Sequence, residues 1–206
     1  MRPTDTHSLT RARQVIAALC ISMTLSAGSF SVDSVLLDAY QKEDMSVWKE
    51  YVDSHSLLAY EYGYCGYIVA EAKKEGKENL LPEAKKYVQH FKSEVSKQKS
   101  QLPAGHYEMY LSAVYVYELR LHESIHPVKA MSLAKEAVKQ APDDPVVLSY
   151  YGTCLFYAPS PFGSKKEALM WFERAQKGFA DEVYRFSWMR VANEMYINQC
   201  KDKLQP

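Results

Sequence analysis

The sequence has no excess of charge of either sign and no paired cysteine motif. Its 206 residues carry 25 Lys and Arg against 25 Asp and Glu, so no surplus of positive charge is available to neutralise phosphates, which argues against nucleic acid as a partner. Cys65, Cys154 and Cys200 follow the first 30 residues without any CxxC spacing. This fits neither a disulfide framework nor a zinc finger, and it favours buried thiols, with one disulfide among them as the alternative.

Catalytic loops are also missing. The sequence contains no G-x-S-x-G segment, no glycine-rich phosphate loop and no Cys/His pair with the spacing of a nucleophile and its base. The segment YGYCGY (62–67) does contain glycine, but it lies within a helical pattern, so Gly63 and Gly66 are predicted to let helices pack closely. The chain is therefore predicted not to be an enzyme, with no catalytic residues, no cofactor and no metal.

The first 30 residues differ in kind from the rest. Arg2, Arg11 and Arg13 precede the apolar run VIAALCISMTLSA (15–27), and small residues follow it. This order is typical of a secretory signal peptide, which we assign to residues 1–30, so the protein is predicted to be exported, to the periplasm or beyond. No second such run follows, and no integral membrane span is expected after signal removal. The alternative is an uncleaved N-terminal anchor.

The remaining sequence contains one helical pattern after another, with turn residues between the periodic segments and almost no strand-like alternation. Residues 31–56 are predicted to form an N-terminal helical hairpin, and residues 57–206 a helical repeat domain. Sixteen tyrosines are many for this length, and they indicate either extensive contacts between helices or a groove that binds a ligand through aromatic side chains. In the segment 106–121, Tyr110, Val114 and Tyr117 form one apolar stripe and Leu111 and Tyr115 another, so this helix is predicted to be covered on more than one face.

Three segments in the C-terminal half of the sequence carry a pattern of small and large apolar residues. The residues that carry it are Ala130, Ala134, Ala137 and Pro142, then Leu148, Tyr151, Gly152 and Leu155, then Ala168, Phe172 and Ala175. This pattern resembles the tetratricopeptide repeat (TPR) family, in the degenerate form of exported bacterial proteins. The resemblance implies an all-α fold, an α-α superhelix of antiparallel helix hairpins (TPR-like solenoid) with about three repeats and a C-terminal capping helix. An irregular helical bundle is the alternative.

An insertion interrupts this pattern at PSPFGS (159–164). The spacing from Ala130 to Ala168 is about four positions longer than a repeat of roughly 34 residues, which predicts an elongated loop between two helices. Phe162 is predicted to pin the loop to the core, and Gly163 to adopt a backbone conformation that other residues avoid. Ser164 and Glu167 have the S-x-x-E spacing of a capping box, which predicts that the next helix begins there.

One motif suggests metal chemistry. His122, Glu123 and His126 spell H-E-S-I-H, the form of the zinc-peptidase H-E-x-x-H, in which both histidines project from one helical face and the glutamate acts as general base. Pro127 argues against this reading, because proline disfavours helical geometry in the residue before it. We therefore expect the helix that carries His122 to end before His126, and a zinc-dependent hydrolase is kept only as an alternative function.

The TPR resemblance implies a function as well as a fold. It predicts a non-enzymatic scaffold or adaptor that binds a protein or peptide in a concave, tyrosine-rich groove; a structural subunit of an envelope assembly is a further alternative. The groove residues that the repeat register implies are Tyr60, Tyr67, Tyr115, Leu119, Ser149, Thr153, Phe156, Met189, Asn193 and Tyr196. None of these is lysine or arginine, so a C-terminal carboxylate is not expected as the target. The alternative is that these side chains pack against a C-terminal helix.

Overall fold

The computed structural model describes residues 32–122, 126–185 and 187–204, and in these ranges the chain forms helices and no strand. The helices are α2 (Val32–Gln41), α3 (Met45–Ser54), α4 (Leu58–Glu71), α5 (Leu81–Lys97), α6 (His106–Arg120), α7 (Pro127–Gln140), α8 (Pro145–Tyr157), α9 (Lys165–Gly178) and α10 (Trp188–Leu204). The predicted all-α class is confirmed. The predicted signal peptide lies outside the described residues.

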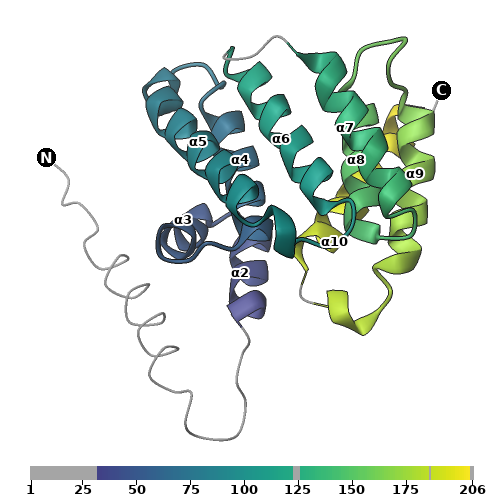
Figure 1. The fold of residues 1–206 in the computed structure, drawn as a ribbon, viewed down its shortest axis with the longest axis horizontal. Helices are drawn as coiled ribbons and strands as arrows, with labels where there is room; N and C mark the ends of the chain where they lie inside the picture. The colour runs from purple at the N-terminus through teal and green to yellow at the C-terminus, as the bar shows by residue number, and fades with distance from the viewer. Residues whose placement is uncertain (1–31, 123–125, 186, 205–206) are drawn as a thin grey trace, which may run out of the picture.

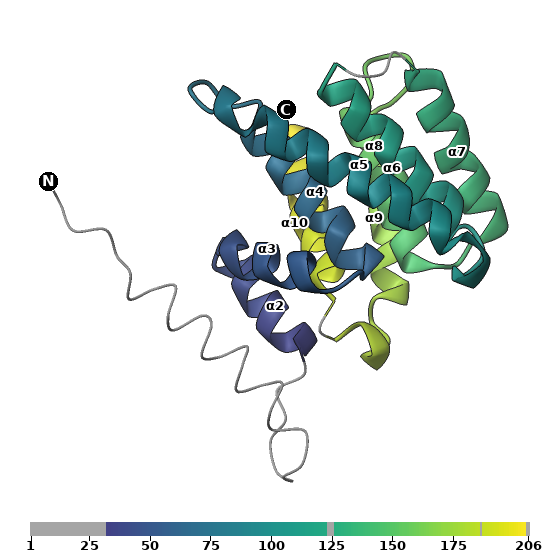
Figure 2. The same ribbon diagram turned by 60° about the vertical axis from the view of Figure 1, so that its left-hand side comes forward.

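The helices pair in chain order. α4 packs on α5, α6 on α7 and α8 on α9, and these pairs stand side by side (Figure 1). α4 also contacts α6, and α6 contacts α8, so the first helices of successive pairs form one layer. α10 then returns along this layer and contacts α8, α9 and α2 (Figure 2). The C-terminal helix therefore covers the layer of first helices.

Small residues allow the close helix contacts that the sequence pattern predicts. Ala134 and Ala137 on α7 and Ala168 on α9 have no exposed surface. Gly152 on α8 faces Phe172 on α9, and a Cβ atom added to this glycine would lie 2.8 Å from the Phe172 ring. Since that distance is well inside van der Waals contact, the crossing of α8 and α9 depends on glycine at this position.

The loop before α9 is built differently from the expectation at two positions. Ser164 does cap α9, because its hydroxyl accepts a hydrogen bond from the Glu167 amide at 3.0 Å. Phe162, however, is 67% exposed, so it does not pin the loop to the core. The constraint on Gly163 is space rather than an unusual backbone conformation, since an added Cβ would lie 2.3 Å from the Leu155 carbonyl oxygen.

The two ends of the described chain meet around a pair of tryptophans. Trp48 of α3 and Trp188 of α10 pack edge to face with ring centroids 5.5 Å apart, and Tyr40 of α2 contacts both rings. Trp48 is fully buried and donates its ring N–H to the Leu36 carbonyl at 2.7 Å. Trp188 donates its ring N–H to the Ala59 carbonyl of α4 at 3.2 Å. The N-terminal hairpin thus shares one core with α10.

Candidate functional site

The predicted groove residues lie on α4, α6, α8 and α10, but many of them are packed inside the protein. Tyr60, Ser149, Phe156, Met189 and Asn193 are buried. The Tyr60 hydroxyl donates to Asp33, and the Asn193 amide donates to the Phe172 carbonyl at 3.0 Å. These contacts give both side chains a role in helix packing.

The other predicted groove residues keep some contact with solvent. Tyr67 is exposed, and Tyr115, Leu119, Thr153 and Tyr196 are half-buried. Tyr115 lies toward α7, since the Lys129 ammonium is 4.6 Å from its ring centroid. Phe156 and Tyr196 are brought together, with ring centroids 5.5 Å apart. Use of these residues as a binding groove stays a prediction.

A second group of tyrosines packs together in the interior. None of its members on α4 and α6 was predicted to line the groove. Tyr62 of α4 and Tyr117 of α6 lie two positions beyond the predicted Tyr60 and Tyr115, and the Tyr117 hydroxyl donates to the Tyr62 carbonyl at 2.9 Å. The Tyr62 ring also packs against Tyr150 of α8, at 6.0 Å between centroids. The stripe through Tyr110, Val114 and Tyr117 in the sequence was the signal that could have identified this face.

We define the tyrosine cluster as Tyr40, Tyr62, Tyr157 and Tyr196, which come from α2, α4, α8 and α10. The Tyr157 and Tyr196 hydroxyl oxygens lie 3.4 Å apart. Burial raises the pKa of Tyr196, and the neighbouring Tyr157, Tyr62 and Tyr40 raise it further. Four helices therefore direct their phenols toward one region.

The tyrosine cluster is not completely covered. Tyr62 contacts several aromatic rings, including Trp188 at 5.7 Å between centroids, and yet part of its side chain remains accessible to solvent. Gly66 and Cys154 are likewise only half-buried, and Tyr157 is 67% exposed. The accessible surface of the tyrosine cluster is therefore provided by Tyr157 and by part of Tyr62.

Tyr62 and Cys154 are uncharged at physiological pH. Burial raises the pKa of Tyr62, and it raises the pKa of the Cys154 thiol to about 11. The Tyr62 phenol and the Cys154 thiol therefore keep their protons, so this phenol can offer an O–H donor and a ring face. Such a surface suits a ligand with aromatic or apolar parts.

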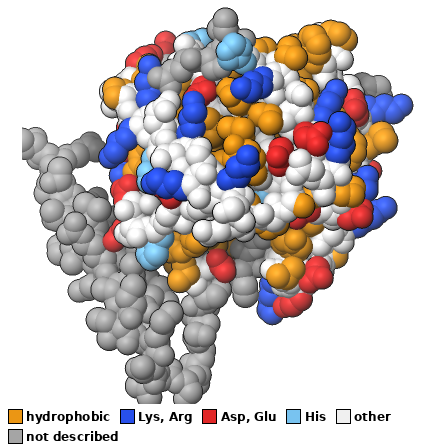
Figure 3. Space-filling view, in the orientation of Figure 1, with side chains coloured by type: hydrophobic (Ala, Val, Ile, Leu, Met, Phe, Trp, Pro, Cys, Tyr) orange, Lys and Arg blue, Asp and Glu red, His pale blue; other side chains and the backbone are white. Residues whose placement is uncertain are grey.

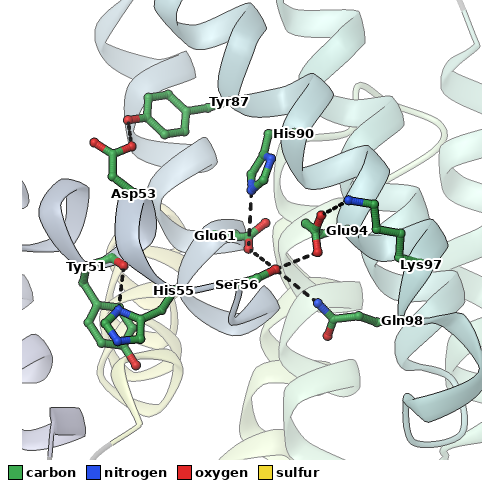
Figure 4. A network of polar contacts seen from close by, with 10 residues as sticks. All are labelled: Tyr51, Asp53, His55, Ser56, Glu61, Tyr87, His90, Glu94, Lys97 and Gln98. Carbon is green, nitrogen blue, oxygen red and sulfur yellow. Dashed lines mark hydrogen bonds and ion pairs between the residues drawn. The ribbon is translucent and has the colours of Figure 1, made fainter.

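A separate polar network joins the start of α4 to α5 (Figure 4). The Ser56 hydroxyl oxygen lies 3.1 Å from Glu61 Oε1 and 2.7 Å from Glu94 Oε2, and it accepts a hydrogen bond from Gln98 at 3.3 Å. Lys97 donates to the other oxygen of Glu94 at 2.6 Å. A hydroxyl has one hydrogen, so Ser56 donates to Glu94, and its contact with Glu61 is favourable when Glu61 carries a proton.

The pKa values of the two carboxyl groups in this network are shifted in opposite directions. Burial raises the pKa of Glu61, which is 1% exposed and whose Oε2 has no hydrogen-bond partner among the described residues. The hydrogen bond from Lys97, followed by that from Ser56, lowers the pKa of Glu94 to about 2. His90 Nε2 lies 4.0 Å from Glu61 Oε1. The Ser56 hydroxyl thus faces carboxylates rather than an imidazole base, which is not the arrangement of an activated nucleophile.

The H-E-S-I-H segment does not form one continuous helix. α6 ends at Arg120, His122 has a positive φ of 59°, and α7 begins at Pro127. His122 Nε2 lies 3.0 Å from the Lys73 ammonium, and Glu123 lies outside the described residues. Over the three described ranges, no group of three or more His, Cys, Asp or Glu side chains is placed to hold a metal ion.

A hollow with polar walls lies between α9 and α10. Its walls are formed by Glu173, Gln176, Lys177, Glu194, Ile197, Asn198 and Lys201. Several of these side chains pair with one another across the hollow: Gln176 donates to Glu194 at 3.1 Å, and Lys201 lies 3.9 Å from Glu173. Since these charges are already paired, the tyrosine cluster is the stronger candidate for a ligand.

On the face of the molecule seen in Figure 3, side chains of both charge signs are interspersed with apolar ones. Among the helices that the structure describes, none is both long and apolar enough to cross a membrane.

Comparisons with known proteins identify the fold alone. No family model and no curated protein matches the chain. A solved helical structure does match it along its whole length, with a TM-score of 0.54 over 100% of this chain and 98% of that chain. That structure is the HusA haemophore from Porphyromonas gingivalis, and its sequence is 16% identical to this one.

Proposed function

We propose that this chain is an exported, non-enzymatic binding protein, a TPR-like scaffold that takes a protein or peptide on its tyrosine-lined inner face. The observation that carries the proposal is the tyrosine cluster, in which Tyr157 and Tyr196 are in contact, phenols from four helices lie close enough to affect one another's pKa, and Tyr62 and Tyr157 remain accessible. Tyrosines give a large contact area at little cost in conformational entropy, because each has only two side-chain torsions.

The TPR-like arrangement is supported by the packing of the helix pairs. The first helices α4, α6 and α8 lie in one layer, and the Gly152 to Phe172 contact brings α8 close to α9 at the position that the repeat pattern assigns to a small residue. Export is supported by the basic, apolar, small order of residues 1–30. A scaffold of this kind presents its ligand surface along the first helices. Because α10 packs over that layer here, we place the ligand on the part that stays accessible, at Tyr62 and Tyr157.

Haem is a second candidate ligand. The rings of Tyr62, Tyr157 and Tyr196 could stack on a planar macrocycle, and the structural match is to a protein described as a haemophore. On this reading the phenols contact the macrocycle through ring faces and neutral O–H donors. Haem would be cargo rather than a resident cofactor.

One pair of variants, measured in two assays, tests both candidate ligands. Tyr157→Ala removes an exposed ring and leaves the core intact, whereas Tyr107→Ala on α6 removes a half-buried tyrosine outside the cluster and serves as the control. The mature protein is titrated with haem, followed by its absorbance, and it is cross-linked in native envelopes to recover protein partners.

We expect Tyr157→Ala, but not Tyr107→Ala, to weaken binding of the true ligand about tenfold, the effect of losing one stacked ring. A partner or haem that binds both variants as it binds the wild type would place the interaction off the tyrosine cluster. Zinc that survives dialysis at one equivalent and is lost in His122→Ala would instead support the hydrolase alternative.

A further inference from the structure

Two lysines converge on the Phe156 ring at the end of α8. Lys165, the first residue of α9, has its ammonium 3.8 Å from the Phe156 ring centroid and also donates to the Phe156 carbonyl. Lys203, in the last turn of α10, has its ammonium 4.7 Å from the same centroid. The C-terminal end of α10 lies beside the loop that joins α8 to α9 (Figure 1). Two segments far apart in the sequence thus place like charges together.

These two ammonium groups lack an acidic partner. Within the described ranges neither Lys165 nor Lys203 forms an ion pair, whereas the nearby Lys201 lies 3.9 Å from Glu173. Burial lowers the pKa of Lys165, and the positive charge of Lys203 lowers it further. The Phe156 carbonyl accepts one hydrogen bond from the Lys165 ammonium, whereas the Lys203 ammonium lies over the ring without a counter-charge among the described residues. An anion that contacts both ammonium groups would relieve this repulsion.

The lysine pair borders the tyrosine cluster. The Phe156 ring contacts Tyr157 at 5.0 Å and Tyr196 at 5.5 Å between centroids, so the two ammonium groups and the two phenols surround one buried ring. The residues of the predicted groove carry no positive charge, and Lys165 and Lys203 supply it from outside the repeat register. The prediction that a C-terminal carboxylate is not the target rested on the groove residues alone.

We propose that Lys165 and Lys203 form a carboxylate subsite for a ligand whose aromatic part lies on Tyr157 and Tyr196. This inference rests on the proposed binding role of the tyrosine cluster and adds the chemical class of the ligand, an aromatic carboxylate. The carboxylate can belong to a small planar molecule or to the C-terminal aromatic residue of a peptide. Both sources offer an anion joined to a flat ring, and two ammonium groups beside exposed phenols match that combination.

The test uses probe pairs that differ only in charge. The small-molecule pair is 1-pyrenebutyrate and the neutral 1-pyrenebutanol, and the peptide pair is acetyl-Ala-Ala-Trp with a free carboxylate and with a C-terminal amide. Binding to the full mature protein is followed by pyrene fluorescence or by calorimetry. The variants are Lys165→Gln and Lys203→Gln, with Lys166→Gln as the control because Lys166 is the exposed neighbour.

We expect the wild type to prefer the acid of at least one pair about tenfold over its neutral partner, and each lysine variant, but not Lys166→Gln, to lose most of that preference. The pair that shows the preference identifies the source of the carboxylate. Equal binding of acid and neutral probes, a preference that survives in both lysine variants, or no binding of any probe would overturn the subsite.

Failure of the subsite is distinguishable from failure of the proposed function. If 1-pyrenebutanol binds and Tyr157→Ala weakens it, the tyrosine cluster binds ligands whether or not the lysines matter. If Tyr157→Ala leaves 1-pyrenebutanol binding unchanged while Lys203→Gln abolishes the acid preference, the anion site exists without the tyrosine cluster, which refutes both the proposed function and the placement of the aromatic part on Tyr157 and Tyr196. Lys203→Gln is the more informative variant, because Lys203 makes no hydrogen bond to the backbone of α8 that its loss would disturb.

Discussion

Gly63→Ala tests how tightly the ends of the chain are packed together. Gly63 lies on α4 beneath the two tryptophans, and an added Cβ would lie 2.4 Å from Trp48 and 2.9 Å from Trp188. Both rings are held by hydrogen bonds from their N–H groups to backbone carbonyls, so neither can move away without losing one. A single methyl group is therefore expected to disturb three helices.

The size of the effect follows from two opposing contributions. Replacing glycine by alanine inside a helix stabilises by about 1 kcal/mol, whereas overpacking a well-filled core costs about 1 to 3 kcal/mol. Because 2.4 Å is far shorter than a normal contact, we take the upper end of that cost. The net loss is then about 2 kcal/mol, which corresponds to a fall in Tm of about 4 to 8 °C for a chain of this size.

Gly66→Ala on the same helix provides the matched control. Its Cβ would lie 3.2 Å from the Tyr117 hydroxyl oxygen, the far end of a side chain, so we expect a change within about 1 kcal/mol. Both variants are measured by thermal and urea unfolding under identical conditions. A Gly63→Ala protein that melts at or above the wild-type temperature, or that loses less stability than Gly66→Ala, would show that the packing of the tryptophans against α4 is looser than these distances imply.

Three further substitutions test other parts of the fold. Gly152→Leu should lower the free energy of unfolding by about 2 to 4 kcal/mol, because any side chain there meets Phe172, and an unchanged urea midpoint would contradict this. Ser164→Ala should cost about 1 kcal/mol in thermal unfolding through loss of the α9 cap, a loss that Ser164→Asp should not show. The raised pKa of Glu61 means that its contribution to stability is present below about pH 4.5 and is lost as the pH rises through the folded-state pKa. Glu61→Gln should therefore be at least as stable as the wild type at pH 8 in urea unfolding, with a smaller gain on acidification; a marked loss at pH 8 would refute a buried, costly carboxylate.

Local features of the fold could be predicted from the sequence, because they depend on neighbours in the chain. The α9 cap at Ser164, the start of α7 at Pro127 and the close crossing at Gly152 all follow from short spacings. The end of α6 before His126 follows from the proline after it. In each case one backbone preference or one helical turn decides the outcome.

Features that depend on distant segments could not be predicted. Tyr62 and Tyr117 pack together, with ring centroids 6.1 Å apart, and although the stripe through Tyr117 marks an apolar face of α6, helical periodicity does not show which of two apolar faces meets α4. Glu118 occupies a position where the repeat pattern has a small residue. It is buried and forms an ion pair with Lys92 of α5, whose ammonium lies 2.7 Å from Glu118 Oε1. The lysines at Phe156 come from two different helices, so no sequence window contains both.

The contact between the N-terminal hairpin and α10 also sets the order in which this protein can fold. Trp188 bonds to a residue 129 positions earlier, so the core around Trp48 cannot close until almost the whole chain has been synthesised. At ribosomal rates of about 5 to 20 residues per second, the first helices wait on the order of ten seconds for their last partner. A contact between such distant residues also slows folding through the entropy of closing a long loop. During that interval the side of Trp48 that packs on Trp188 stays uncovered, so the nascent chain exposes an apolar surface that only the last helix can bury.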